Sequence, residues 1–161
     1  MTGMAATRPD APQAAPPVVD TAAPVLPATA TMRDVLKLMA AERRAGIAIA
    51  DVHGSYLGTC TLRGLAGSCL GVRGAASQAI PSFAFRHDDM AAARRRLAPE
   101  LDAPAGANLD PQVPVLAMPV ALSDALRHLH LGAPLVAVVE PQTRRFIGTI
   151  EPDAILAALN A

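Results

Sequence analysis

Two short segments place a glycine, hydroxyl groups and carboxyl groups around the start of a predicted helix. Residues 58–64 read GTCTLRG, and residues 148–154 read GTIEPDA. Thr61 stands at the predicted helix start of the first segment, where a threonine commonly caps free backbone N–H groups and where an anion can also be held. In the second segment Glu151 would repel a phosphate unless a metal or an arginine intervened. Asp153 either turns toward a ligand or only complements the positive end of the helix dipole.

The remaining reactive side chains form no catalytic or metal-binding pattern. His128 and His130 are two residues apart, a spacing that suits shared metal chelation on neither a helix nor a strand. No serine lies in a nucleophile motif, and the sequence has no phosphate loop or dinucleotide-binding glycine motif. Cys60 and Cys69 have neither metal-ligand spacing nor the number needed for a disulfide framework. We therefore expect no metal site and no enzymatic activity.

Composition and charge exclude several classes of partner. The 161 residues include 14 basic and 14 acidic side chains, so no net charge attracts nucleic acid or an anionic membrane. Aromatic residues make up only 2% of the chain, which leaves few platforms on which bases could stack. No apolar run has the length of a membrane span, and the N-terminus lacks the pattern of a secretory signal. We expect a cytoplasmic protein that binds neither nucleic acid nor a membrane.

An internal repeat provides the elements that position the two segments. The tripeptide PVL at 24–26 recurs at 114–116, and the same shift of 90 residues aligns 58–64 with 148–154. Each unit begins with a predicted amphipathic helix, because apolar residues recur at i, i+3, i+4 and i+7 from Met32 and from Leu122. A buried strand, a turn, a second strand and a second helix follow. The predicted unit is therefore helix, strand, strand, helix.

These elements predict an α/β (α+β) fold with two related units. We expect a disordered Ala/Pro-rich tail over residues 1–23, a first repeat over 24–70 and a second over 113–161. A long connection over 71–112 contains a predicted short helix at 88–97. Connections of this length are either functional or disordered, and the sequence does not choose between the two.

The two units carry a family resemblance. Residues 31–65, TMRDVLKLMAAERRAGIAIADVHGSYLGTCTLRGL, resemble one cystathionine-beta-synthase (CBS) repeat. Residues 121–156, ALSDALRHLHLGAPLVAVVEPQTRRFIGTIEPDAIL, resemble a second. The resemblance implies a pseudo-two-fold pair in which two short sheets pack between helices that flank a cleft, commonly as a homodimer. It also implies a regulatory module that senses adenine nucleotides or related ligands and has no catalytic machinery.

The resemblance implies two pseudo-symmetric ligand sites. In that family a hydroxyl lies near the phosphate and an Asp three residues later binds the ribose. Thr61 keeps the hydroxyl, but Gly64 and Ala154 stand where the two ribose carboxylates are expected. The implied aliphatic walls and their polar partners are Gly46, Ile47 and Ala48 with Thr61 in one site, and Val136 and Ala137 with Asp153 in the other. We expect at most one competent site.

The sequence therefore predicts a stand-alone, degenerate CBS pair that acts in trans. An adenosine-containing ligand such as AMP, ATP or S-adenosylmethionine would bind between the repeats and change how the surface meets an unidentified protein partner. No cofactor is required. The alternative is a ligand-free scaffold for dimerisation and protein interaction, which the missing ribose carboxylates favour.

Overall fold

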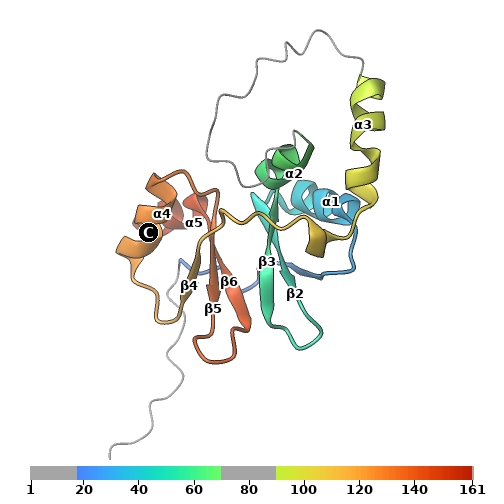
Figure 1. The fold of residues 1–161 in the computed structure, drawn as a ribbon. Helices are drawn as coiled ribbons and strands as arrows, with labels where there is room; N and C mark the ends of the chain where they lie inside the picture. The colour runs from blue at the N-terminus through green and yellow to red at the C-terminus, as the bar shows by residue number, and fades with distance from the viewer. Residues whose placement is uncertain (1–17, 70–89, 161) are drawn as a thin grey trace, which may run out of the picture.

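Each half of the chain forms the same small unit of strand, helix, strand, strand and helix (Figure 1). The computed structural model describes residues 18–69 and 90–160. The first unit comprises β1 (Val25–Pro27), α1 (Met32–Glu42), β2 (Gly46–Ala50), β3 (Tyr56–Thr61) and α2 (Leu62–Cys69). The second comprises β4 (Val115–Ala117), α4 (Leu122–His130), β5 (Val136–Val139), β6 (Phe146–Ile150) and α5 (Pro152–Leu159). Between them lie α3 (Met90–Asp102) and a short 3-10 helix (Ala105–Ala107).

The two three-stranded sheets are paired in the same way. In each unit the first strand runs parallel to the second, and the second and third form an antiparallel hairpin. The predicted α/β fold with two related units is confirmed. The sequence analysis missed β1 and β4, since three residues are too few to show alternation.

Pairing in the sheets refines the repeat register. Val25 pairs with Ala48 in the first sheet, and Val115 pairs with Ala137 in the second. Equivalent residues of the central strands are therefore 89 apart, whereas the outer strands keep the shift of 90. The second repeat has lost one residue before its central strand and gained one in its hairpin turn, so both ends of the unit still align.

The first helix begins with the capping box that its sequence predicts. The Thr31 hydroxyl accepts a hydrogen bond from the Asp34 N–H, and the Asp34 carboxylate accepts one from the Thr31 N–H. Met32 and Val35 then lie on the buried side of α1, where they pack against Ile47 and Ile49 of β2. These contacts form the core of the first repeat.

Side chains from both sheets fill the seam between the repeats. Ala48 of β2 and Ala137 of β5 are 1% and 0% exposed and belong to one apolar cluster with Leu135. The rings of Tyr56 and Phe146 stack at the hairpin end of this cluster, with centroids 6.0 Å apart. The two sheets are therefore held together by a closely packed apolar layer.

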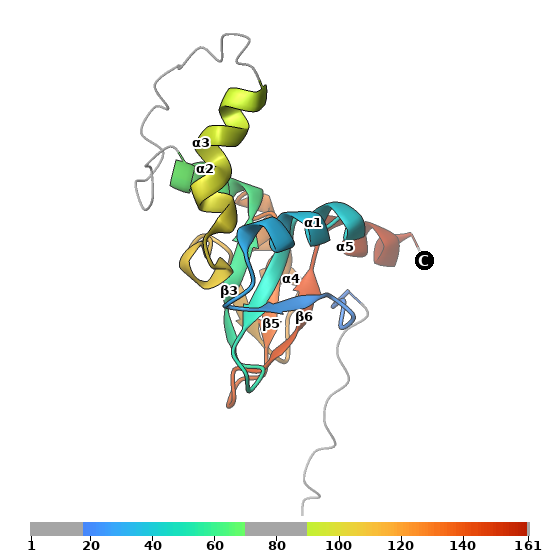
Figure 2. The same cartoon turned by 90° about the vertical axis from the view of Figure 1, so that its right-hand side faces the viewer.

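The described part of the connection packs on the first repeat. The predicted helix at 88–97 corresponds to α3, which starts at Met90 and packs against α1 and α2; residues 88 and 89 lie outside the described residues. Figures 1 and 2 show α3 and α5 at opposite ends of the molecule. After α3, the Ala105 N–H donates to the Ala30 carbonyl at 2.7 Å, and Ala105 is fully buried.

Residues 18–20, which we expected in the disordered tail, pack on the second repeat. Asp20 forms an antiparallel bridge with Thr149 of β6, and Val18 and Val19 are 6% and 7% exposed within the core of that repeat. These two valines contact the same cluster as Ile155 of α5. Among the described residues, no helix is long and apolar enough to span a membrane.

Candidate functional site

Thr61 stands between β3 and α2, and its hydroxyl makes two hydrogen bonds. It accepts one from the Gly64 N–H at 2.9 Å, which is the capping contact expected of a threonine at a helix start. It donates the other to the Asp110 carboxylate, with Oγ1 and Oδ2 2.6 Å apart. Thr61 is 1% exposed, so its hydroxyl is enclosed by protein atoms.

Asp110 reaches this position from the end of the connection between the repeats. Its Oδ2 also accepts from Arg63 Nε at 3.2 Å, and its Oδ1 accepts from the Gln112 N–H at 2.9 Å. The backbone N–H of Asp110 donates to the Thr59 carbonyl at 2.8 Å. The Asp110 side chain is 3% exposed. Both carboxylate oxygens are thus bound by groups of the chain itself.

Gly64 leaves the space that Asp110 occupies. A Cβ atom on Gly64 would lie 2.9 Å from the Asp110 Cβ, closer than real Cβ contacts allow. The carboxylate that we expected at position 64 is therefore supplied in this region by residue 110. The sequence analysis missed this residue, because the contact joins positions 49 apart in the chain.

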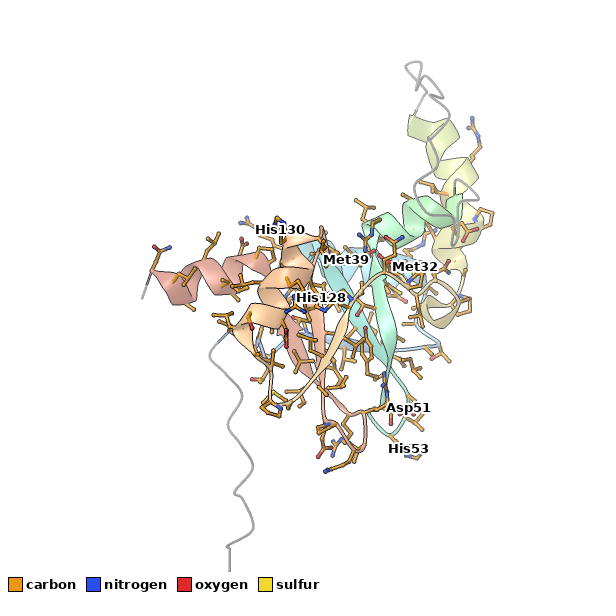
Figure 3. All side chains as sticks on the ribbon, turned by 60° about the vertical axis from the view of Figure 1, so that its left-hand side comes forward. Met32, Met39, Asp51, His53, His128 and His130 are labelled. Carbon is orange, nitrogen blue, oxygen red and sulfur yellow. The ribbon has the colours of Figure 1, made fainter. Side chains whose placement is uncertain are left out.

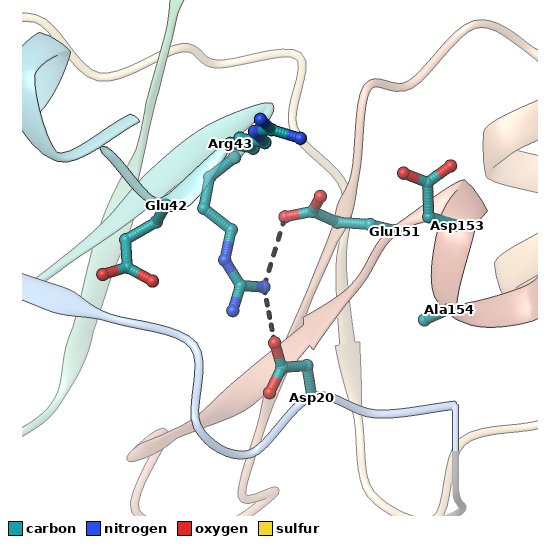
Figure 4. Close-up of a pocket in the computed structure, with 7 residues that line it drawn as sticks. Asp20, Glu42, Arg43, Glu151, Asp153 and Ala154 are labelled. Atoms are coloured by element: carbon teal, nitrogen blue, oxygen red, sulfur yellow. Dashed lines mark ion pairs between the residues drawn. The ribbon is translucent and has the colours of Figure 1, made fainter. Parts of the chain in front are cut away.

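The second repeat has an open, ionic pocket in the corresponding region. The pocket has a volume of about 340 Å³ and lies between the end of α1, the N-terminal segment and the start of α5 (Figure 4). Its lining is four carboxylates, two guanidinium groups and one alanine: Asp20, Glu42, Arg43, Arg44, Glu151, Asp153 and Ala154. This excess of negative charge disfavours a phosphate group.

Arg44 lines this pocket and lies between two of its carboxylates. Its Nη1 lies 2.5 Å from Asp20 Oδ2 and 3.7 Å from Glu151 Oε1. Burial raises the pKa of Glu151, and the positive charge of Arg44 and the Ala45 N–H oppose that rise. Glu151 thus has the arginine beside it that a nearby phosphate would require, but Asp20 already binds that arginine.

Asp20 and Asp110 occupy equivalent positions in the two repeats. They are 90 residues apart, and their N–H groups donate to the Thr149 and Thr59 carbonyls at 2.8 Å in both cases. Each Oδ1 accepts from the backbone N–H two residues later, again at 2.9 Å in both cases. The segment before each repeat therefore binds to the third strand of the other repeat. The shift of 90 was the sequence pattern that could have identified this pair.

Comparison with known structures identifies this arrangement. A CBS domain-containing protein of unknown function from Bacillus anthracis has a TM-score of 0.61 and 13% identity, covering 89% of this chain and 89% of that one. One from Kribbella flavida has a TM-score of 0.56 and 23% identity, with coverages of 89% and 95%. A CBS domain pair/ACT domain protein from Thermotoga maritima has a TM-score of 0.54 and 18% identity, with coverages of 88% and 92%. This chain has the fold of a tandem CBS domain pair. No protein-family model matches the sequence, and no curated protein matches it significantly.

The predicted aliphatic walls lie inside the packed cores of this chain. Gly46, Ile47 and Ala48 are buried, and Val136 and Ala137 are both fully buried. Ile47 and Val136 face the helix side of their sheets, while Ala48 and Ala137 face the seam. A Cβ atom on Gly46 would meet the Cys60 carbonyl oxygen at 2.8 Å. Of the seven predicted binding residues, Asp153 lines the described pocket.

Other reactive groups of the chain lie apart from one another. Figure 3 shows His53 and Asp51 at the turn between β2 and β3, away from His128 and His130 on α4. Within residues 18–69 and 90–160, no three His, Cys, Asp or Glu side chains are grouped to hold a metal ion. Cys60 is fully buried, and burial raises the pKa of its thiol to about 12.

Proposed function

We propose that this CBS pair is a non-catalytic regulatory module that acts in trans by contact with a partner protein, without an adenine nucleotide bound at either repeat. The carboxylate of Asp110 at Thr61 is the observation that carries the proposal. A nucleotide would need this hydroxyl and the adjacent helix start, and a buried anion of the chain already has them. A phosphate beside Asp110 would also face like charge.

The second repeat supports the same proposal through its charges. Arg44 is one of the two arginines that line the pocket, and it is bound by Asp20 and Glu151. The remaining lining includes Glu42 and Asp153, which also repel phosphate. Ala48 and Ala137 are 1% and 0% exposed in the packed seam, so a base beside either residue would have to displace neighbouring side chains.

A second candidate function is the adenine-nucleotide sensor. The pocket of about 340 Å³ favours it, because this volume lies within the range of small-molecule sites and two arginines line it. In this function AMP, ATP or S-adenosylmethionine would displace Asp20 from Arg44, and Asp153 would bind ribose hydroxyls. Ligand-dependent regulation would then require different affinities for two arrangements of the chain.

Calorimetry and thermal unfolding of the full chain separate the two functions. We expect no heat and no change in Tm with AMP, ATP or S-adenosylmethionine at millimolar concentration. A saturable rise in Tm that is lost in Arg44→Gln would instead establish the sensor. Arg33→Gln is the matched control, because Arg33 forms an exposed ion pair with Asp102. It removes the same charge at a distance from the pocket-lining residues.

We also propose that the module is a homodimer. Exposed leucines on α4 and α5 support this: Leu122, Leu126, Leu156 and Leu159 are 39%, 43%, 57% and 69% exposed. In a two-fold interface one patch meets its own copy, so an apolar patch is complementary to itself. Light scattering after size exclusion should give twice the chain mass. Leu126→Glu should give the monomer, whereas Leu57→Glu on β3, at 45% exposure, should leave the dimer intact.

A further inference from the structure

We propose that Thr61, Arg63 and the adjoining backbone form a carboxylate-binding site whose ligand is Asp110 of the same chain. This inference rests on the proposed function, because it explains why repeat 1 holds no nucleotide. It goes further by assigning the site a ligand class, a carboxylate, and a role, which is to hold the connection onto repeat 1. External anions are excluded as long as Asp110 is bound.

The site has the donors that a carboxylate needs. Thr61 Oγ1 donates to Oδ2 at 2.6 Å, within the short range of hydrogen bonds from a hydroxyl to a charged acceptor. Arg63 Nε donates to the same oxygen at 3.2 Å and provides the compensating charge. The Gln112 N–H donates to Oδ1 at 2.9 Å. One hydroxyl, one guanidinium group and one amide thus bind the two oxygens.

The surroundings of the site fit the connection in shape as well as in charge. A Cβ on Gly64 would lie 2.9 Å from the Asp110 Cβ, and one on Gly58 would lie 2.8 Å from Leu109 Cδ1. Two glycines therefore admit two consecutive residues of the connection. The Asp110 side chain is 3% exposed, so a carboxylate that lost these partners would remain buried and unpaired.

The equivalent aspartate of the other repeat provides independent support. Asp20 makes the same backbone contact to β6 that Asp110 makes to β3, and it also binds an arginine, Arg44 at 2.5 Å. Two different arginines, Arg63 and Arg44, thus bind carboxylates that enter from the segment before a repeat. The pairing of an inserted aspartate with a guanidinium group is common to both halves.

Chemical rescue of a vacated site tests the proposal. Asp110→Ala in the full chain removes one carboxylate and leaves a space the size of formate. We expect the Tm of this variant to fall by roughly 5–10 °C, because buried hydrogen bonds to a charge are lost. Sodium formate should then raise the Tm, by about 3 °C at ten times its Kd, relative to sodium chloride at equal ionic strength. Wild type should show no such difference between the two salts.

Two further variants test whether the rise in Tm with formate is specific to the Asp110 site. Asp102→Ala removes a carboxylate from the end of α3 whose side chain is 66% exposed, so its Tm should change by less than about 2 °C and formate should not rescue it. Asp110→Ala combined with Thr61→Val should lose the response to formate. An equal Tm of Asp110→Ala in formate and in chloride would overturn the proposal.

A second measurement applies where Asp110→Ala does not fold. Asp110→Asn keeps the volume of the side chain, and Thr61→Val removes only the hydroxyl. A double-mutant cycle on urea unfolding should give a clearly non-additive loss, because the two side chains share one hydrogen bond. Additive losses would overturn the proposal. Nucleotide binding by wild type with intact formate rescue would refute the proposed function and leave this site assignment standing.

Discussion

The N-terminal segment should be released from the second repeat by a single methyl group. In Gly148→Ala the new Cβ would lie 2.8 Å from the Asp20 carbonyl carbon and closer still to its oxygen. These are backbone atoms in a strand pairing, so a rotamer change cannot relieve the contact. The Asp20 N–H bond to Thr149 at 2.8 Å and the reciprocal bond at 3.2 Å must break or stretch.

The expected cost follows from what this segment buries. Val18 and Val19 are 6% and 7% exposed, and returning two valines to water costs about 3–4 kcal/mol. Two backbone hydrogen bonds contribute roughly 1–3 kcal/mol together. Releasing three residues returns about 3–6 kcal/mol of conformational entropy. The midpoints of these ranges give a loss of about 1 kcal/mol in the free energy of unfolding for Gly148→Ala, and their extremes allow at most about 4 kcal/mol.

Urea unfolding and hydrogen exchange measure this loss and locate it. Protection of the Asp20 and Thr149 amides should fall in Gly148→Ala. Gly67→Ala is the matched control, because a Cβ at Gly67 in α2 has no atom within 4 Å. That variant should be unchanged or more stable by up to about 1 kcal/mol, since alanine favours a helix over glycine.

Deleting residues 1–20 provides the decisive comparison. In the shortened chain Gly148→Ala has nothing left to displace, so its cost should fall to nearly zero. A full-length Gly148→Ala variant as stable as wild type, with Asp20 still protected, would refute the packing argument. So would an undiminished cost in the shortened chain.

Three other predictions concern single side chains. Burial raises the pKa of Glu151 in the folded chain above its ordinary value of 4.5. Protonated Glu151 therefore contributes its full stabilisation of the fold below pH 4.5, and this contribution is lost as pH rises through the folded-state pKa. Glu151→Gln should therefore become more stable relative to wild type as pH rises above 4.5 in urea unfolding; a difference that is constant with pH would contradict this. Cys60, with its thiol pKa raised to about 12, should resist alkylation at pH 8 until the chain unfolds, as mass spectrometry of its peptide would show. Rapid labelling of the native chain would oppose that expectation. Thr31→Ala should lower the free energy of unfolding by about 1 kcal/mol through loss of the α1 cap, and Thr31→Ser should restore most of it.

Local patterns in the sequence predicted the elements of the fold well. The apolar spacing from Met32 and the Thr31–Asp34 cap depend on contacts within one helix, so they can be recognised without knowing the partners of that helix. The hairpins follow from strands and turns that are adjacent in the chain. The short strands β1 and β4 were missed because their pairing with β2 and β5 is parallel and each spans only three residues.

The candidate site could not be predicted to the same extent. Thr61 was correctly located at the start of a helix, but its partner Asp110 is 49 residues away, in the part of the connection that follows the predicted short helix. The missing carboxylate at Gly64 suggested a lost site, since sequence spacing cannot show that another segment fills the space. Asp20 was assigned to the tail because the composition around it is rich in proline and alanine.

The reciprocal contacts of Asp20 and Asp110 connect the site residues to the stability of the fold. Each aspartate precedes one repeat and pairs with the third strand of the other, Thr149 or Thr59. A small molecule at either helix start must therefore replace contacts that also hold the two repeats together. The apparent affinity of that small molecule is its intrinsic affinity multiplied by the fraction of chains in which the aspartate has already left. Because the chain's own carboxylates bind at both positions, the arrangement of the repeats depends less on a ligand, which suits the proposed module, whose partner is another protein.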